Sequence, residues 1–130
     1  VLLFNSQKQV VLQLRSRKKE RYGWKWAYHG GHVAYGQTPL QTATHEMMEE
    51  LGIDLDLNFH GVKLYETQYE SQYTYSYYGF HDGPYSFNRN EVDAVKAFDP
   101  QKLLDGGYDE QYVILPWVKV YLRELVKVWG

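Results

Sequence analysis

The segment from Gly30 to Ile53 ends in a predicted helix that carries three glutamates close together. At about 100° of turn per residue, Glu46, Glu49 and Glu50 fall within one arc of roughly 100°. The neighbouring arc is apolar and is expected to face the core: Leu40, Ala43, Met47 and Leu51. One side of this helix is therefore predicted to pack, and the adjacent side to present carboxylates.

The ends of the helix are predicted by its capping residues. Thr38 is a favourable N-cap, Pro39 suits the first helical position, and Gln41 completes a capping-box pattern with Thr38. Gly52 is expected to end the helix in a left-handed conformation. The pattern thus predicts a helix that begins at Pro39 and stops just before Gly52.

The glutamates lie where a helix disfavours negative charge. They occupy the last turns, where the helix dipole destabilises anions by a few tenths to about 1 kcal/mol each. A bound cation would reverse that effect, and Gly30 and Gly31 supply backbone that can approach such an ion closely. Mg²⁺ prefers carboxylate, water and phosphate oxygens, which this arrangement can supply.

The same segment resembles the Nudix box, a glycine, five residues, a glutamate, seven residues and then Arg-Glu-apolar-x-Glu-Glu-x-Gly-apolar. Gly31 takes the place of the first glycine, and the later positions in register are Glu46, Met47, Glu49, Glu50, Gly52 and Ile53. Two positions depart from the pattern: Gln37 stands where the family has glutamate, and His45 where it has arginine. The resemblance implies an α/β fold, the Nudix fold, with a mixed β-sheet in an α/β/α sandwich.

Two flanking segments are similar to the subgroup of Nudix proteins related to isopentenyl-diphosphate isomerase. Upstream, the matching residues are Gln13, Arg15, Ser16, Lys19 and Trp26. Downstream, Glu91-Val92-Asp93 resembles a signature of the family's late loop and strand. The resemblance therefore covers most of the chain, although only the box is highly specific.

The resemblance also implies roles for the acidic residues. Glu49 and Glu50 would be metal ligands, Glu46 would bind metal or orient the attacking water, and the carbonyl of Gly30 would lie close to the ion. Glu91 maps to a loop that often carries a further metal-binding or general-base carboxylate. A surface glutamate before a strand is equally expected at that position, and a solvated helix face is the alternative for the other three.

Arg15 and Lys19 are candidates for binding substrate phosphate, because a guanidinium can donate two parallel hydrogen bonds to it. A charged, solvated hairpin over residues 15–21 is the alternative.

The alternating Tyr73, Tyr75 and Tyr77 predict a strand. Packing in the sheet is favoured for them over stacking on a base or covering an apolar substrate tail.

The strands and helices expected along the rest of the sequence indicate a single domain over residues 1–130. Strands are expected at 10–14, 32–35 and 92–98, an extended piece at 24–28, and an amphipathic helix at 115–129. Because the chain begins within an apparent strand, upstream residues are expected to be missing.

Composition limits the partners and the chemistry. A net charge of −2 gives no reason to expect nucleic-acid binding, and no apolar run suits a membrane span. The absence of cysteine excludes thiolate catalysis and disulfides. A cytoplasmic protein is the default expectation, and its oligomeric state is open, with a homodimer one possibility.

Three functions remain. The leading one is a Mg²⁺- or Mn²⁺-dependent hydrolase that cuts a diphosphate linkage in a nucleoside diphosphate derivative or related small metabolite. The second is isopentenyl-diphosphate isomerase, which is disfavoured because Gly30 occupies the place of that enzyme's cysteine. The third is a non-catalytic ligand-sensing Nudix domain, which the departures at Gln37 and His45 keep open.

Overall fold

A computed structural model describes residues 1–19, 22–66, 68 and 71–129. Its elements in chain order are β1 (Leu2–Phe4), β2 (Val10–Arg15), β3 (Trp26–Ala27), α1 (Pro39–Leu51), β4 (Asn58–Glu66), β5 (Ser71–Phe80), β6 (Val92–Phe98), α2 (Pro100–Leu104) and α3 (Pro116–Trp129). Glu20 and Arg21, part of the predicted charged hairpin, lie outside the described residues.

Strand β2 lies at the centre of a mixed sheet. It pairs antiparallel with β1 and β3 along one edge, and with β6 over most of its other edge. Strand β1 pairs in parallel with β5, which forms an antiparallel hairpin with β4. This arrangement confirms the predicted mixed sheet.

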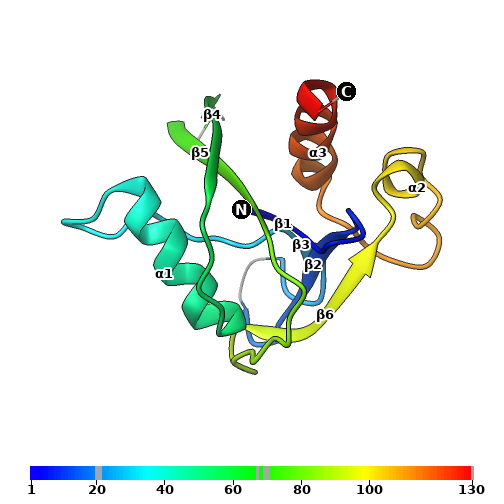
Figure 1. The fold of residues 1–130 in the computed structure, drawn as a ribbon, viewed down its shortest axis with the longest axis horizontal. Coiled ribbons are helices and arrows are strands. Elements are labelled where there is room, and N and C mark those ends of the chain that lie inside the picture. The colour runs from blue at the N-terminus through cyan, green and yellow to red at the C-terminus, as the bar shows by residue number, and fades with distance from the viewer. Residues whose placement is uncertain (20–21, 67, 69–70, 130) are drawn as a thin grey trace.

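The two faces of the sheet pack against different helices because side chains alternate along each strand. On one face, Leu3 and Val11 join Met47 and Leu51 of α1 in a buried cluster. On the opposite face, the cluster joins the strands to α2 and α3: Leu2, Phe4, Leu12, Phe98, Leu103, Val118 and Leu122. Figure 1 shows α1 on one side of the sheet and α2 and α3 on the other, as the predicted α/β/α sandwich requires.

The capping analysis of the box helix is confirmed. The Thr38 side chain accepts a hydrogen bond from the Gln41 N–H, the Gln41 side chain bonds back to Thr38, and Pro39 begins the helix. Gly52 ends it with φ 66°. The strand predicted at 92–98 is also confirmed as β6, and the helix predicted at 115–129 as α3.

Two expectations for this region are wrong. Residues 32–35 form an exposed irregular segment and not a strand, because β3 already ends at Ala27 and the chain then passes through Gly30, whose φ is 148°. Leu40 is 46% exposed and not part of the core. The first turn of α1 extends beyond the buried cluster that holds Met47 and Leu51.

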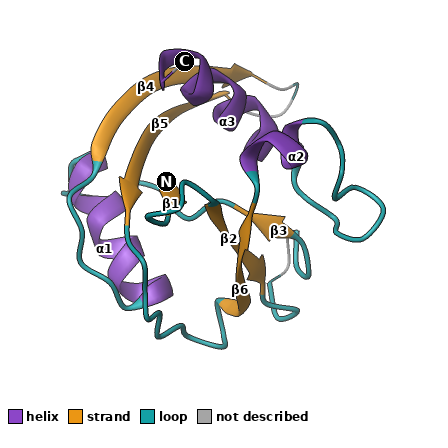
Figure 2. Cartoon of the chain, turned by 45° about the vertical axis from the view of Figure 1, so that its right-hand side comes forward, coloured by secondary structure: helices purple, strands orange, loops and turns teal. Residues whose placement is uncertain are grey.

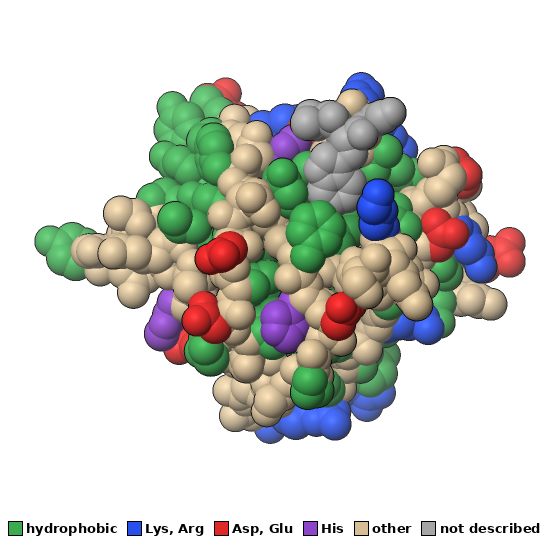
Figure 3. Space-filling model, in the orientation of Figure 1, with side chains coloured by type: hydrophobic (Ala, Val, Ile, Leu, Met, Phe, Trp, Pro, Cys, Tyr) green, Lys and Arg blue, Asp and Glu red, His purple; other side chains and the backbone are tan. Residues whose placement is uncertain are grey.

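The β4–β5 hairpin carries an apolar face. Phe59 pairs with Tyr77, Val62 with Tyr75 and Leu64 with Tyr73, so these side chains share one side of the hairpin. Tyr77 is buried, whereas Tyr73 is 67% and Tyr75 42% exposed. Packing in the sheet therefore explains Tyr77 but not the two exposed tyrosines. Figure 3 shows hydrophobic side chains gathered over the outer end of this hairpin.

The opposite side of the hairpin approaches α3. Lys63 of β4 forms an ion pair with Glu124 of α3, and His60 lies 3.9 Å from the same carboxylate. In Figure 2 the hairpin arches from α1 towards α3. None of the helices in the described part of the chain is long and apolar enough to cross a membrane.

Gly52 and Gly36 offer a matched test of the helix end. Both have positive φ, 66° and 82°, but a Cβ at Gly52 would lie 2.8 Å from the Ser86 carbonyl oxygen, whereas open space surrounds Gly36. Gly36→Ala is expected to lower the free energy of unfolding by about 1 kcal/mol through backbone strain alone. Gly52→Ala is expected to cost clearly more, measured by urea denaturation. Equal losses would show that contact with Ser86 does not constrain the helix end.

Candidate functional site

The last two turns of α1 place its three glutamates at different depths. Glu50 is 4% exposed and faces the sheet, Glu46 is half-buried, and Glu49 is exposed. Although the three side chains share one arc of the helix, their exposure to solvent increases from Glu50 to Glu46 to Glu49. The sequence pattern predicted the arc but not this gradient.

The carboxylate of Glu50 is held at both oxygens. Gln13 Nε2 of β2 donates to Oε1 at 3.1 Å, and the Gly30 N–H donates to Oε2 at 3.1 Å. Burial raises the pKa of Glu50 to about 7, an effect that the hydrogen bonds from Gln13 and Gly30 oppose and the charge of Glu46 reinforces. The site thus holds a carboxylate whose ionised form is supported by donors but poorly solvated.

Glu46 lies against the second glycine of the loop. A Cβ at Gly31 would be 3.0 Å from Glu46 Oε1, so a larger residue would require this carboxylate to move by a few tenths of an ångström. Burial raises the pKa of Glu46, and the charges of Glu49 and Glu91 raise it further, whereas His45 and Lys19 lower it. The electrostatic influence of Glu91 and Lys19 places both residues in the surroundings of the acidic helix.

Lys19 and Glu91 form an ion pair between the loop after β2 and the start of β6. The Ser16 N–H donates to the Glu91 carbonyl oxygen at 3.1 Å and joins the two segments. Arg15, the last residue of β2, precedes this loop and is partly buried. The two candidate phosphate-binding residues and Glu91 therefore lie on adjoining segments beside the site.

The two departures from the box have separate partners. His45 Nε2 lies 3.0 Å from Glu49 Oε1, one helical turn further on, and both side chains are more than half exposed. Gln37 Oε1 accepts a hydrogen bond from Thr42 Oγ1 at 2.8 Å, and Thr42 in turn accepts one from the Ala34 N–H. Gln37 thus fixes the loop against the start of α1, while His45 interacts with a glutamate of the site.

Sequence reasoning assigned no role to two buried polar residues. Gln13 is 1% and His29 0% exposed. The His29 ring contacts the Val11 carbonyl oxygen at 2.8 Å and Gln13 Nε2 at 3.2 Å, and burial lowers its pKa to about 4. The sequence feature that could have indicated this buried polar pair is Gln13, the one amide in the apolar run Val10–Leu14.

The donors at this site fit a hard divalent cation. Glu46 and Glu50 each have a raised pKa for which burial is the largest cause, so a nearby positive charge would stabilise both ionised forms. Gly31 leaves room that a side chain would fill, and all the candidate ligands are oxygen atoms. Among the described residues, however, no three acidic or histidine side chains already converge as a metal cluster.

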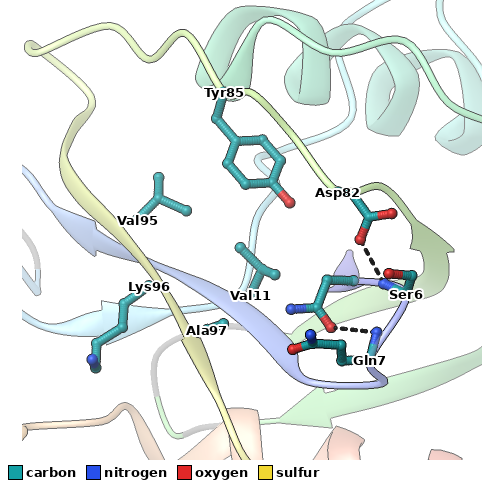
Figure 4. Close-up of a pocket in the computed structure, with 9 residues that line it drawn as sticks. Ser6, Gln7, Val11, Asp82, Tyr85, Val95, Lys96 and Ala97 are labelled. Carbon is teal, nitrogen blue, oxygen red and sulfur yellow. Dashed lines mark hydrogen bonds between the residues drawn. The ribbon is translucent and has the colours of Figure 1, made fainter.

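A surface pocket of about 340 Å³ lies elsewhere on the α1 side of the sheet. Figure 4 shows its lining, which includes Val11, Asp82, Tyr85 and Val95. Asp82 accepts a hydrogen bond from the Ser6 N–H at 2.7 Å. The lining contains none of the box glutamates, so the candidate site is assigned from the carboxylate chemistry and not from this cavity.

Comparison with known proteins supports the family resemblance. A family model described as NUDIX domain matches residues 1–118. A search of curated proteins found no match.

Several solved structures share the fold. A MutT protein from Methanosarcina mazei has a TM-score of 0.81 at 16% identity, with coverage of 97% of this chain and 88% of that one. DR0079 from Deinococcus radiodurans has a TM-score of 0.77 at 22% identity, covering 94% and 77%. A C. elegans Ap4A hydrolase has a TM-score of 0.71 at 15% identity, covering 98% and 92%.

The raised pKa of Glu50 predicts a pH-dependent stability. The pKa of this carboxyl is about 7 in the folded protein, compared with an ordinary value of 4.5 in the unfolded chain. Its protonated form therefore stabilises the fold fully below pH 4.5, and this stabilisation is lost as the pH rises through 7. In the metal-free protein, Glu50→Gln removes this loss. The stability of the variant relative to the unmodified protein should therefore rise by up to about 3 kcal/mol as the pH increases from 4.5 to about 8.

The measurement is the free energy of urea unfolding with EDTA present, taken as the difference between the two proteins. His29 titrates with the opposite sign, because its lowered pKa makes its contribution disappear as the pH falls from 6.5 towards 4. Because His29 is present in both proteins, its contribution cancels when the unfolding free energy of one is subtracted from that of the other. A difference that does not change with pH would contradict the assigned environment of Glu50.

Proposed function

The chain belongs to the NUDIX family, and from that premise we propose that it hydrolyses a diphosphate linkage with the help of Mg²⁺ or Mn²⁺. The proposed substrate is a small molecule, a nucleoside diphosphate derivative or a related metabolite. The observation that carries the proposal is the buried carboxylate of Glu50, held at both oxygens beside Glu46. A helix with a merely solvated acidic face would not bury one of its carboxylates against the sheet.

The proposed cation ligands are the carboxylates of Glu46, Glu49 and Glu50, with the Gly30 carbonyl close to the ion. When bound, the ion would neutralise charge on the diphosphate and make a water molecule more acidic. Gln13 and Gly30 would keep Glu50 in place, since they already donate to it. Glu49 would have to leave its contact with His45, or share it.

Glu46 is the proposed residue that orients the attacking water or accepts its proton. For the second role its carboxylate would have to stand free of the ion, because the raised pKa that suits a general base would be lowered again by direct contact with a cation. Its half-buried position between Gly31 and solvent leaves it accessible to a water molecule. Glu91 is the alternative base or an additional ligand, and its ion pair with Lys19 would have to open for either role.

Arg15 and Lys19 are the proposed phosphate-binding residues. Lys19 lies within electrostatic range of the acidic helix, since its charge lowers the pKa of Glu46. In the free protein its ammonium neutralises Glu91, so an incoming diphosphate would compete with that carboxylate for the same charge. Arg15 would supply a bidentate contact of the kind that a guanidinium favours.

A ligand-sensing domain is the second candidate, and one observation favours it. Glu49, a ligand in the full box, is paired with His45, and both are exposed. A site whose third carboxylate is engaged elsewhere could bind a diphosphate without cleaving it. Isopentenyl-diphosphate isomerase activity stays the disfavoured alternative, since Gly30 stands at the position of that enzyme's cysteine and the sequence has no cysteine.

Turnover of a panel of diphosphate compounds tests the proposal. With Mg²⁺ or Mn²⁺ present, released phosphate is measured after coupling to a phosphatase. Glu50→Gln and Glu49→Gln are each expected to lower kcat/KM by roughly a hundredfold or more, because each removes a ligand charge while keeping the shape. Glu110→Gln, at an exposed position outside the site, is the matched control and should leave the rate unchanged.

The outcomes separate the functions. Phosphate release that depends on Glu50 supports the hydrolase. Conversion of an isopentenyl diphosphate without phosphate release would favour an isomerase. Tight binding of a diphosphate with no reaction would favour the sensor.

Restoring the box is expected to speed hydrolysis. An arginine is always charged and offers a fixed set of donors that can hold a catalytic glutamate in place, so His45→Arg should raise kcat/KM by about fivefold, or about 1 kcal/mol. Gln37→Glu keeps an acceptor for Thr42 and adds the charge found in the full box. The double variant should gain more than either substitution alone.

The comparison uses one substrate at fixed Mg²⁺ for the unmodified protein, the two single variants and the double variant. A flat or lower rate in the double variant would show that Gln37 and His45 serve a different task, and the sensor hypothesis would then become the better one.

A further inference from the structure

Gln13 is a buried amide with an unusual set of neighbours. Its Nε2 atom lies 3.1 Å from Glu50 Oε1, 3.2 Å from the Tyr28 carbonyl oxygen and 3.2 Å from His29 Nδ1. An amide nitrogen carries two N–H groups, so it cannot donate fully to all three. Because Gln13 is 1% exposed, water cannot make up the difference.

The tautomer of His29 follows from its contacts. Nε2 lies 2.8 Å from the Val11 carbonyl oxygen, which can only accept, so Nε2 carries the proton. Nδ1 is then an acceptor and faces the Gln13 amide. Since a carboxylate, a carbonyl and this bare nitrogen all surround Nε2 of Gln13, the amide can point only its N–H groups towards them.

The backbone of the sheet fixes both residues. Gln13 pairs in register with Ala27 of β3 and Val95 of β6, and the His29 N–H donates to the Val1 carbonyl oxygen at 3.0 Å. The amide therefore projects from a central strand with strands on both sides. Glu50, by contrast, is the one member of the group that comes from a helix.

We propose that Gln13, oriented by His29, is the positioning residue for Glu50 and so sets the affinity of the site for a divalent cation. The inference rests on the proposed function, because it takes Glu50 as a cation ligand. The amide fixes Oε1, and the Gly30 N–H fixes Oε2, so the carboxylate needs no further ordering when the ion binds. Without the amide, Glu50 would keep its burial and lose its donor from the sheet.

Mg²⁺ binding to the purified protein tests this proposal without reference to turnover. Titration calorimetry, together with the Mg²⁺-induced rise in Tm relative to the same protein in EDTA, is measured for Gln13→Met, which keeps the length of the side chain but removes the amide. The expected result is a loss of about tenfold or more in Mg²⁺ affinity. In activity assays, excess Mg²⁺ should restore most of the turnover of Gln13→Met and none of that of Glu50→Gln.

Leu12→Val is the matched control. Leu12 is the preceding residue of β2, is fully buried and faces α3 on the other side of the sheet. The substitution should lower Tm in EDTA while leaving Mg²⁺ affinity unchanged. This separates positioning of Glu50 from general destabilisation of the strand.

Gln13→Asn serves as a second variant if Gln13→Met does not fold. It keeps an amide that ends one carbon short of Glu50, and its Mg²⁺ affinity is also expected to fall. Unchanged affinity in either folded variant, alongside weakened binding in Glu50→Gln, would overturn the role of Gln13 alone. Absence of Mg²⁺ binding by the unmodified protein, or undiminished binding by Glu50→Gln, would overturn the proposed function and this inference together.

Discussion

The burial of one carboxylate beneath helix α1 is the constraint on which the rest of the site depends. Glu50 is placed against β2 by the same helical turns that bury Met47 and Leu51, so core packing and site assembly cannot be separated. A charged group in this position needs donors and, when ionised, a compensating charge. Gln13 and Gly30 supply the donors, and the cation we propose would supply the charge.

Much of this fold could be predicted from local sequence rules. The caps at Thr38 and Gly52 set the limits of α1 because capping depends on the identity of one or two residues and on little else. The strand at 92–98 was equally readable from its β-branched and apolar residues. The order of strands and helices along the chain already favours a mixed sheet. The family resemblance added its α/β/α layering, which no local pattern contains.

The depth of each glutamate could not be predicted in this way. Helical periodicity gives the angle of a side chain around its axis, but the distance from the sheet depends on where the helix lies, which is set by residues far away in the chain. The same reason explains Leu40, which has the right angle for the core and lies beyond the edge of the buried cluster. The segment at 32–35 has strand-forming residues, but no strand in the described part of the chain pairs with it.

The contacts of Glu50 also bear on the order of events during folding. Gln13 and Gly30 lie 37 and 20 positions away from it in the sequence. Such contacts form only after long loops have closed, so a nascent or isolated box helix lacks the arrangement of oxygens found in the native protein. Cation loading would accordingly follow tertiary assembly, and the ion would act on the finished fold and not as a template for it.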